Sequence, residues 1–588
     1  MRRWLRTAVL VVVLSLALVG PAVSATAPTG PPTSVGTGGA ATTVERLATE
    51  AAIEALRRGG NAVDAAVTAA AVLGVTEPFS AGIGGGGFMV IYRSSDGLVT
   101  TIDHRETAPA AMGPASFLED GRPLPFNDAR YSGLSAGVPG TVAGWAMALD
   151  RYGTISLREA LRPAMHVAAR GFVIDQVFFD QTQANRDYFD DLPATAALFL
   201  DRDGTPRDVG TVFRNPDLLR TYARIAALGP AGFYQGPVAR AIVGTVTRPP
   251  VGPGANHEWR PGVMTTADLD KYTAVEREPT HVEYRGYDVY GMGPPSSGGS
   301  TVGEALNILE GFDLSGMSRE EVLHLFLEAS RFAFADRNAY LADPDFFDVP
   351  LTGLLSDAFA AERRANITDR PAASAVPAGD PYPYDDGAPR GEASATVVRA
   401  GSTTHLNVSD RDRNVVSYTF TIESTGGNGM VVPGYGFLLN NELTDFNFDS
   451  TTHPNRVEGG KRPRSSMAPT IVLRDGAPLL TVGSPGGSMI ITTVLQILVD
   501  RLDLGTPLPD AIAAPRASQR NTPMTSAEPA FIASPEGQAL AARGHRFAPT
   551  PEIGAASAIE FLDDDRVLAA AEPVRRGGGS ALVEHPGR

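Results

Sequence analysis

The sequence predicts a mixed α and β fold, and three kinds of pattern predict it. Apolar residues recur at helical spacing over residues 48–58 and 320–337. A short apolar run with β-type residues, 88–92, is typical of a strand. Two further β-type runs, Thr404–Ser409 and Val415–Thr421, flank a polar turn and predict a hairpin.

Length, charge and cysteine content limit the possible classes of protein. A chain of 588 residues exceeds one ordinary hydrophobic core, so we expect two domains or two intertwined halves. The hydrophobic content of 43% is typical of a soluble globular protein. A net charge of −16 argues against nucleic acid and anionic membranes as partners. Because the chain has no cysteine, disulfides, thiolate metal sites, a cysteine nucleophile and a lipoprotein anchor are excluded.

The first 25 residues have the pattern of a secretory signal peptide. Arginines form the positive end, residues 8–19 the apolar run and residues 23–25 a small-residue cleavage site. The apolar run is shorter than the ~18 residues that a membrane span needs. We therefore expect removal after Ala25, no stable membrane anchor, and a secreted protein in the extracellular or cell-envelope space. Residues 26–40 are rich in Pro, Gly, Ser and Thr and predict a flexible lead-in.

Two helices open the ordered part of the chain, which we expect to begin at residue 41. The first covers 48–58, and Asn61 can cap the second, over 62–73. The glycine run 82–87 matches G-x-G-x-x-G, but a dinucleotide site needs a strand before it and a helix after it. Here a helix precedes and a strand follows, so we reject nucleotide binding and expect the glycines to allow close backbone approach.

The middle of the chain, residues 130–370, alternates helical patterns with loops and contains no recognisable chemistry of its own. Within it, the amphipathic helix over 320–337 is interpreted as core, and a strand over 285–290 leads into a tight loop. The nine histidines show no ligand spacing, so neither a metal nor another cofactor is expected. Residues 371–399 are rich in Pro, Ala, Gly and Asp and predict a mobile linker.

Four motifs in the second half of the chain resemble the γ-glutamyltranspeptidase family. In family order and at near-family spacing they are Thr403-Thr404-His405 and the stretches 436–446, 461–467 and 483–488. The resemblance covers about residues 41–580. Members of this family are N-terminal-nucleophile hydrolases that cleave themselves, so that the first Thr of Thr-Thr-His becomes a new chain N-terminus.

The resemblance implies an α+β fold, a four-layer αββα sandwich with two stacked sheets. It also implies two processed chains of one precursor that form a heterodimer. Cleavage between Ser402 and Thr403 would give a large chain, 41–402, and a small catalytic chain, 403–588. Residues 371–399 would then be a mobile tail that lets the new chain end leave the active site.

The implied chemistry needs one group that is both nucleophile and base. A threonine hydroxyl is a poor nucleophile, but an N-terminal threonine carries an α-amine with a pKa of about 7.7–8.0. Thr403 would attack the Ser402 carbonyl during maturation and a γ-glutamyl carbonyl during turnover. The predicted hairpin places Thr421 opposite Thr403, about 5 Å away, where it could orient the nucleophile. Gly486 and Gly487 match the family residues whose N–H groups hold the oxyanion.

The family also implies a clamp for a free amino-acid head group. Arg105 would bind the substrate α-carboxylate, because a planar guanidinium suits a carboxylate, and Ser465 and Ser466 would help to hold it. Glu442 and Asp445 match the positions that bind the α-amino group. Carboxylates on one side, and an arginine with hydroxyls on the other, select a zwitterion.

Two departures from the family pattern affect substrate choice. Glu423 stands where family members often have Asn, and its charge could strengthen the grip on the ammonium or mark a different substrate. The segment 446–460 is shorter than the lid loop of lidded bacterial members and has no Tyr. An open cleft for long or polymeric γ-glutamyl substrates is therefore expected.

These observations predict a secreted, self-cleaving γ-glutamyltransferase/hydrolase. It would transfer the γ-glutamyl group of glutathione-like compounds to water or to amino-acid and peptide acceptors. Two alternatives stay open. A related acylase would remove glutaryl or similar side chains from β-lactams, but a glutaryl group lacks the ammonium that Glu442 and Asp445 would hold, while Arg105 suits both donors. A secreted binding protein that never matures could keep the clamp without turnover.

Overall fold

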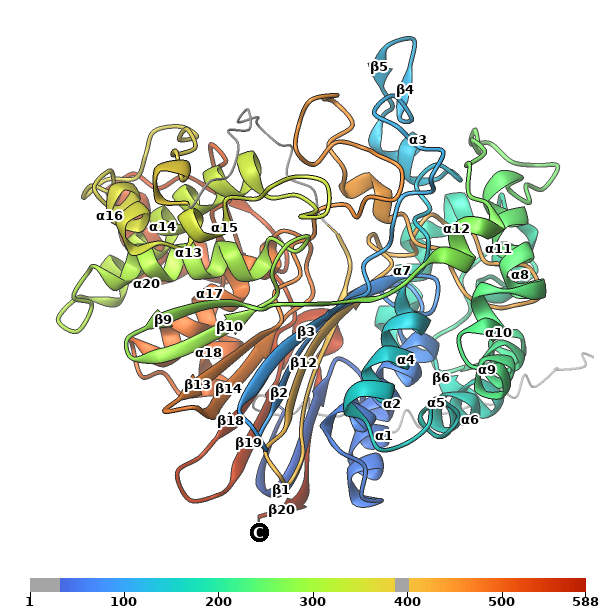
Figure 1. Cartoon of the computed structure of the whole chain (residues 1–588), viewed down its shortest axis with the longest axis horizontal. Coiled ribbons are helices and arrows are strands. Elements are labelled where there is room, and N and C mark those ends of the chain that lie inside the picture. The colour runs from blue at the N-terminus through green and yellow to red at the C-terminus, as the bar shows by residue number, and fades with distance from the viewer. Residues whose placement is uncertain (1–31, 386–400, 588) are drawn as a thin grey trace, which may run out of the picture. The chain divides into compact units, whose positions relative to one another are not determined.

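The computed structural model describes residues 32–385 and 401–587 (Figure 1). The predicted signal peptide therefore lies outside the described residues. None of the helices in these two ranges is both long and apolar enough to cross a lipid bilayer.

One antiparallel sheet of thirteen strands organises the described residues. In pairing order the strands are β8 (Val275–Arg277), β3 (Leu98–Asp103), β2 (Gly86–Arg93), β12 (Val415–Thr421), β11 (Thr404–Ser409), β1 (Thr33–Thr43), β19 (Val567–Ala571), β18 (Ser557–Phe561), β14 (Ala477–Gly483), β13 (Thr470–Arg474), β10 (Tyr287–Gly291) and β9 (Thr280–Tyr284), and β20 (Ser580–Pro586) also pairs with β1.

The two halves of this sheet face each other. Thr481 on β14 donates to the Asn407 side chain on β11 at 2.8 Å, and the Thr470 amide of β13 donates to Ser417 on β12 at 3.2 Å. These strands are far apart in the pairing order, so the sheet folds over to give two stacked layers.

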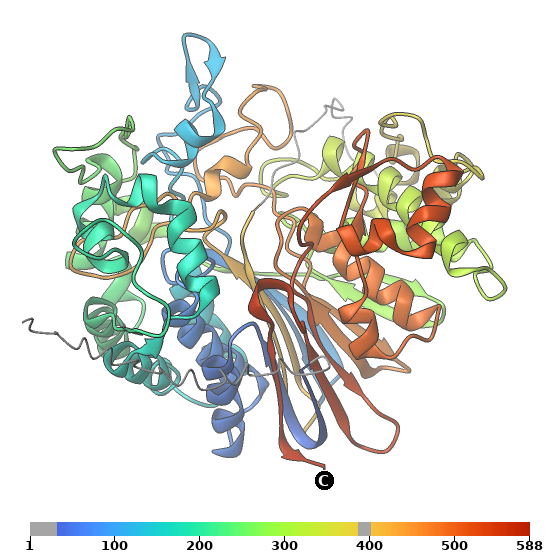
Figure 2. The same ribbon diagram turned by 180° about the vertical axis from the view of Figure 1, so that it is seen from behind.

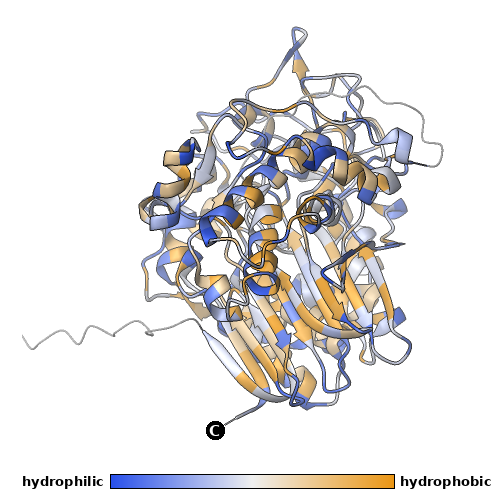
Figure 3. Ribbon diagram, turned by 90° about the vertical axis from the view of Figure 1, so that its left-hand side faces the viewer, coloured by the Kyte–Doolittle hydropathy of each residue, from blue (hydrophilic) through white to orange (hydrophobic). Residues whose placement is uncertain are grey.

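Helices cover both outer faces (Figures 1 and 2). On β2, Met89 and Ile91 pack in a core with α1 (Arg46–Arg57), α2 (Ala62–Thr76) and α4 (Thr141–Tyr152). Phe88 and Val90 belong to the other core, with α13 (Gly298–Glu310), α14 (Arg319–Tyr340) and α17 (Met489–Leu502). Figure 3 shows the apolar residues concentrated along the strands and the flanking helices. The expected αββα sandwich is confirmed.

Further helices surround these layers. Beside α1, α2 and α4 the chain forms α5 (Leu157–Ala160), α6 (Arg162–Arg170), α7 (Gln176–Phe189), α8 (Pro193–Phe199), α9 (Pro216–Leu228), α10 (Ala231–Tyr234), α11 (Gly236–Thr247) and α12 (Thr266–Lys271). After α13 it forms α15 (Leu351–Leu354), α16 (Asp357–Arg364), α18 (Leu508–Ala513), α19 (Pro529–Ala533) and α20 (Pro535–Arg543).

Local signals predicted several of these elements well. The hairpin strands are confirmed at both ends, with Thr404 opposite Phe420 and Ser409 opposite Val415. Asn61 caps α2 as expected, because its side chain accepts from two amides of the first turn. The helix predicted over 320–337 is α14.

The flexible lead-in predicted for residues 26–40 is wrong from Thr33 onward. Residues Thr33–Thr43 form β1, which pairs with β11, β19 and β20. The small residues that suggested a linker are needed because these strands crowd together. A Cβ on Gly36 would lie 2.1 Å from the carbonyl oxygen of His585, and one on Gly39 would lie 2.6 Å from that of Ser409.

Part of the segment predicted to be mobile, 371–399, has defined contacts. The amide of Ala372 donates to Glu328 at 2.9 Å, that of Val376 to Asn521 at 2.8 Å, and that of Gly379 to Asp336 at 2.6 Å. The amino-acid composition did not predict that the part of this segment up to residue 385 makes such contacts. Residues 386–399 lie outside the described residues, and their mobility stays a prediction.

Asn407→Ala should destabilise the stacking of the two sheet layers. The buried amide of Asn407 donates to the Ser557 carbonyl at 2.9 Å and accepts from Thr481, so the alanine variant strands buried polar groups. We expect the free energy of unfolding to fall by about 2–4 kcal/mol in equilibrium urea unfolding. The exposed Gln538→Ala is the control, with a change within about 0.5 kcal/mol. Equal effects of the two substitutions would contradict this role.

Candidate active site

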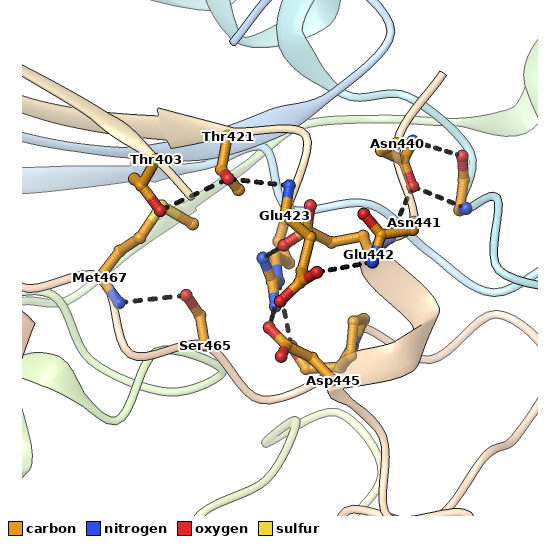
Figure 4. A network of polar contacts seen from close by, with 12 residues as sticks. Thr403, Thr421, Glu423, Asn440, Asn441, Glu442, Asp445, Ser465 and Met467 are labelled. Atoms are coloured by element: carbon orange, nitrogen blue, oxygen red, sulfur yellow. Dashed lines mark hydrogen bonds and ion pairs between the residues drawn. The ribbon is translucent and has the colours of Figure 1, made fainter. Parts of the chain in front are cut away.

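The hairpin register brings two threonine hydroxyls together at one end of the sheet. Thr403 directly precedes β11 and Thr421 ends β12, and their Oγ1 atoms lie 3.4 Å apart (Figure 4). The predicted pairing of these residues is thus confirmed. Thr421 also donates to the Ser402 carbonyl oxygen at 2.7 Å and accepts from the Glu423 amide at 2.8 Å. Its hydroxyl is therefore held on both sides.

The chain is continuous through Ser402 and Thr403, so the geometry is that of the uncleaved protein. The Thr403 hydroxyl lies 2.6 Å from the carbonyl oxygen of Ser402. The Ser402 amide donates to the Glu423 carbonyl at 2.6 Å, and the Arg576 guanidinium donates to the Thr403 carbonyl at 2.5 Å and to Ser80 at 2.6 Å. The bond between Ser402 and Thr403 is fixed from both sides.

The predicted oxyanion glycines lie between β14 and α17. Gly486 has a φ of 134° and Gly487 a φ of 57°, a backbone region that favours glycine. Within residues 32–385 and 401–587, neither amide donates to a protein acceptor. A Cβ on Gly401 would lie 3.4 Å from the Cα of Gly487, so this turn packs beside the Ser402–Thr403 bond. Two free amides near that bond suit a developing oxyanion.

A single cavity gathers most of the residues predicted from the sequence. Its lining includes Arg105, Thr403, Thr421, Glu423, Glu442, Asp445, Ser465, Ser466 and Gly487. Gly486 is not part of this lining, although its neighbour is. Residues from both predicted chains therefore form one site.

The two halves of the predicted clamp contact each other. Arg105 is 1% exposed, and its guanidinium forms ion pairs with Glu442 and, at 2.5 Å, with Asp445. The guanidinium also donates to the backbone carbonyls of Pro463 at 3.1 Å and Arg464 at 3.3 Å. The predicted carboxylate-binding arginine is thus neutralised by the carboxylates predicted to bind the ammonium.

The two serines have different partners. Ser465 Oγ accepts from the Met467 amide at 3.1 Å, and Ser466 Oγ accepts from a guanidinium nitrogen of Arg337 at 2.6 Å. Arg337 was missed because its helix was interpreted as core. The available signal was a cationic residue within an otherwise apolar helix face.

Burial sets the protonation of the carboxyl groups. Burial, and then the nearby Asp445, raise the pKa of Glu423 to about 7, while hydrogen bonds from Ser424 and Asn441 oppose this. Burial likewise raises the pKa of Glu442 well above its usual value, against the pull of Arg105. Burial also raises the pKa of Glu106, a residue that the sequence reasoning missed, to about 8, against the pull of the adjacent Arg105. Glu423 is therefore partly protonated near neutral pH.

Glu423→Gln should remove a pH-dependent contribution to stability. Because the folded pKa lies above the unfolded value of 4.5, the folded protein holds a proton that the unfolded chain releases. The stability of the wild type relative to the variant should therefore fall by up to about 3 kcal/mol as pH rises from 4.5 to 7.5. Urea unfolding of both proteins at several pH values measures this difference. A difference that does not change with pH would contradict the assignment.

Comparisons with known proteins show the family of this chain. A family model described as Gamma-glutamyltranspeptidase matches residues 48–582. The glutathione hydrolase proenzyme of Bacillus subtilis (strain 168) is 38% identical over 558 residues, 93% of this chain and 92% of the relative. The acylase ACY 1 proenzyme of Pseudomonas sp. (strain SE83) is 36% identical over 564 residues, 93% of this chain and 95% of the relative.

A solved structure extends the comparison to the fold. The crystal structure of cephalosporin acylase from Bacillus halodurans matches with a TM-score of 0.83 and 27% identity, covering 96% of this chain and 99% of that one. The family model spans most of the sequence and the relatives cover nearly all of it. This chain belongs to the γ-glutamyltranspeptidase family.

Proposed function

We propose that this protein is a self-cleaving γ-glutamyltransferase/hydrolase with Thr403 as its nucleophile. The observation that carries the proposal is the position of the Thr403 hydroxyl. It lines the cavity beside the Ser402 carbonyl and Thr421, close to the free amides of the Gly486–Gly487 turn.

In the proposed maturation step, the Thr403 hydroxyl attacks the Ser402 carbonyl carbon. The C–N bond breaks, an ester forms between Ser402 and the Thr403 oxygen, and the α-amine of Thr403 is released. Water then hydrolyses the ester, which frees the Ser402 carboxylate and restores the hydroxyl. The two products are the large and small chains, which stay together as a heterodimer because β11 and β12 lie between strands of the large chain.

In turnover, the free α-amine of Thr403 accepts the hydroxyl proton as the oxygen attacks the γ-carbonyl of the donor. The amides of Gly486 and Gly487 hold the oxyanion, and losing one such donor typically costs about 10²–10³ in rate. The amine then returns the proton to the leaving nitrogen, and the γ-glutamyl ester remains on Thr403. Water or an amino-acid or peptide amine takes the acyl group.

The head-group clamp supports a γ-glutamyl donor such as glutathione. Glu442, Asp445 and Glu423 form an acidic end that suits the α-ammonium, and the arginines and serines suit the α-carboxylate. The short segment 446–460 supports access for longer donors. The signal-peptide pattern of residues 1–25 supports export to the extracellular or cell-envelope space.

An acylase is the second candidate, because relatives and a solved structure that are named acylases are similar over nearly the whole chain. Both reactions use the same nucleophile and oxyanion site. They differ in the acyl group, since glutaryl donors lack the α-ammonium.

Thr403→Ala should abolish both self-cleavage and donor hydrolysis, because the variant lacks the attacking oxygen. Thr404→Ala is the matched control, since the buried hydroxyl of Thr404 has no hydrogen-bond partner within the described residues. Denaturing gels report cleavage, and release of p-nitroaniline from γ-glutamyl-p-nitroanilide reports turnover. A cleaved, active Thr403→Ala protein would refute the mechanism.

The choice of acyl group separates the two candidate enzymes. We expect kcat/KM for γ-glutamyl-p-nitroanilide to exceed that for glutaryl-p-nitroanilide by about 10–100-fold, since a charged hydrogen bond contributes about 1.5–3 kcal/mol. Faster hydrolysis of the glutaryl compound would favour the acylase instead.

A further inference from the structure

Arg337 is a buried cation that lines the active-site cavity and has only neutral hydrogen-bond partners among the described residues. It lies on α14, is 6% exposed, and contributes to the cavity lining. Its guanidinium donates to Ser297 Oγ at 2.9 Å, to the side-chain oxygen of Asn338 at 2.9 Å and to Ser466 Oγ at 2.6 Å. All three acceptors are neutral, and within the described ranges Arg337 forms no salt bridge.

A second cation adds to this charge. Arg464 is 4% exposed, also lines the cavity, and donates from Nη1 to the backbone carbonyl of Arg337 at 3.3 Å. Burial, and then the neighbouring Arg464, hold the pKa of Arg337 well below its usual value, against the pull of Asp445. Because a buried charge without a partner is costly, this end of the cavity favours an anionic ligand.

Arg105, which donates to the Arg464 carbonyl at 3.3 Å, differs, since Glu442 and Asp445 already neutralise it. The cavity therefore holds acidic groups paired with Arg105 and two cations, Arg337 and Arg464, without an ion pair of their own within the described residues. A zwitterionic head group matches this division.

The contact with Ser466 gives Arg337 a way to act on a ligand. A guanidinium has donors and no acceptor, so the oxygen of Ser466 must accept from Arg337. The hydroxyl hydrogen of Ser466 is then left free to donate into the cavity. Ser297 connects the same guanidinium to the Ser465 backbone, because its hydroxyl donates to the Ser465 carbonyl at 2.5 Å.

We propose that Arg337 is a positioning residue that determines specificity for acyl donors carrying a carboxylate. It fixes the Ser466 hydroxyl as a donor to that carboxylate and provides the positive charge that the neutralised Arg105 lacks. The inference rests on the proposed function of this cavity and deepens it by assigning the carboxylate end of the clamp.

The experiment compares two competitive inhibitors of γ-glutamyl-p-nitroanilide hydrolysis, glutamate and 4-aminobutyrate. They share the ammonium and the γ-carboxyl group, and only glutamate has the α-carboxylate. In Arg337→Met, we expect the inhibition constant of glutamate to rise about 30-fold or more, as for a lost charge-assisted contact. The constant for 4-aminobutyrate should change less than about threefold. The KM for γ-glutamyl-p-nitroanilide should rise together with the inhibition constant of glutamate, whereas kcat should stay within about threefold of the wild-type value.

Two further variants keep the test decisive. Arg337→Lys retains a charge and a donor and should show a smaller rise, confined to glutamate, even if Arg337→Met does not fold or cleave. Arg331→Met removes another buried arginine of α14, one that pairs with Glu328 and lies outside this cavity lining. This variant controls for general damage to the helix. It should not change the inhibition constant of glutamate more than that of 4-aminobutyrate.

Equal effects on both inhibitors, or no effect on glutamate, would overturn the role of Arg337. A wild-type protein that does not hydrolyse γ-glutamyl-p-nitroanilide would instead refute the proposed function, before any variant is compared. A double variant with Ser466→Ala provides the final check. If Arg337 acts through Ser466, the two substitutions should raise the inhibition constant by much less than the product of their separate effects.

Discussion

The active site depends on the register between β11 and β12. Side chains alternate between the faces of a strand, so a shift of one residue would turn Thr403 away from Thr421 and from the cavity. The register is fixed by the tight polar turn at one end and by alternating cores along the strands. Leu406, Val408, Val416 and Tyr418 pack against the helices of one outer layer, while Asn407 and Ser417 face the second sheet layer. The packing that stabilises the sandwich thereby positions Thr403, the proposed nucleophile.

The charges of the cavity follow from where the strands and loops end. Arg105, just past β3, meets Glu442 and Asp445 from a distant part of the chain, whereas Arg337 comes from the outer helix α14. Burial raises the cost of each charge, and the ion pairs of Arg105 offset part of it. Acidic and basic groups in one cavity give a preorganised field that suits the proposed zwitterionic head group.

Local sequence signals predicted the strands of the hairpin to the residue. They also predicted the presence of α2, its Asn61 cap and the position of α14. These features depend on short-range periodicity and turn chemistry. The strand β1 was missed because its Gly- and Thr-rich sequence acquires its meaning only from three distant partners. The stacking of two sheet layers came from family resemblance, since periodicity reports the faces of a strand and not what covers them.

The candidate site was likewise predicted only in part. Most of the motif residues that the resemblance assigned line one cavity, but their mutual contacts were not predictable. No sequence pattern indicates that Arg105 is neutralised by Glu442 and Asp445, or that Arg337 reaches Ser466 across 129 positions of the chain. Such pairings depend on tertiary placement.

The central claim is that Thr403 becomes a chain terminus. Intact-mass measurement and N-terminal sequencing of the purified wild-type protein test it most directly. Our account predicts two fragments, the smaller beginning Thr403-Thr404-His405 and ending at Arg588. A single uncut chain that nevertheless hydrolyses γ-glutamyl donors would contradict it, because an internal Thr403 has no free α-amine to act as its base.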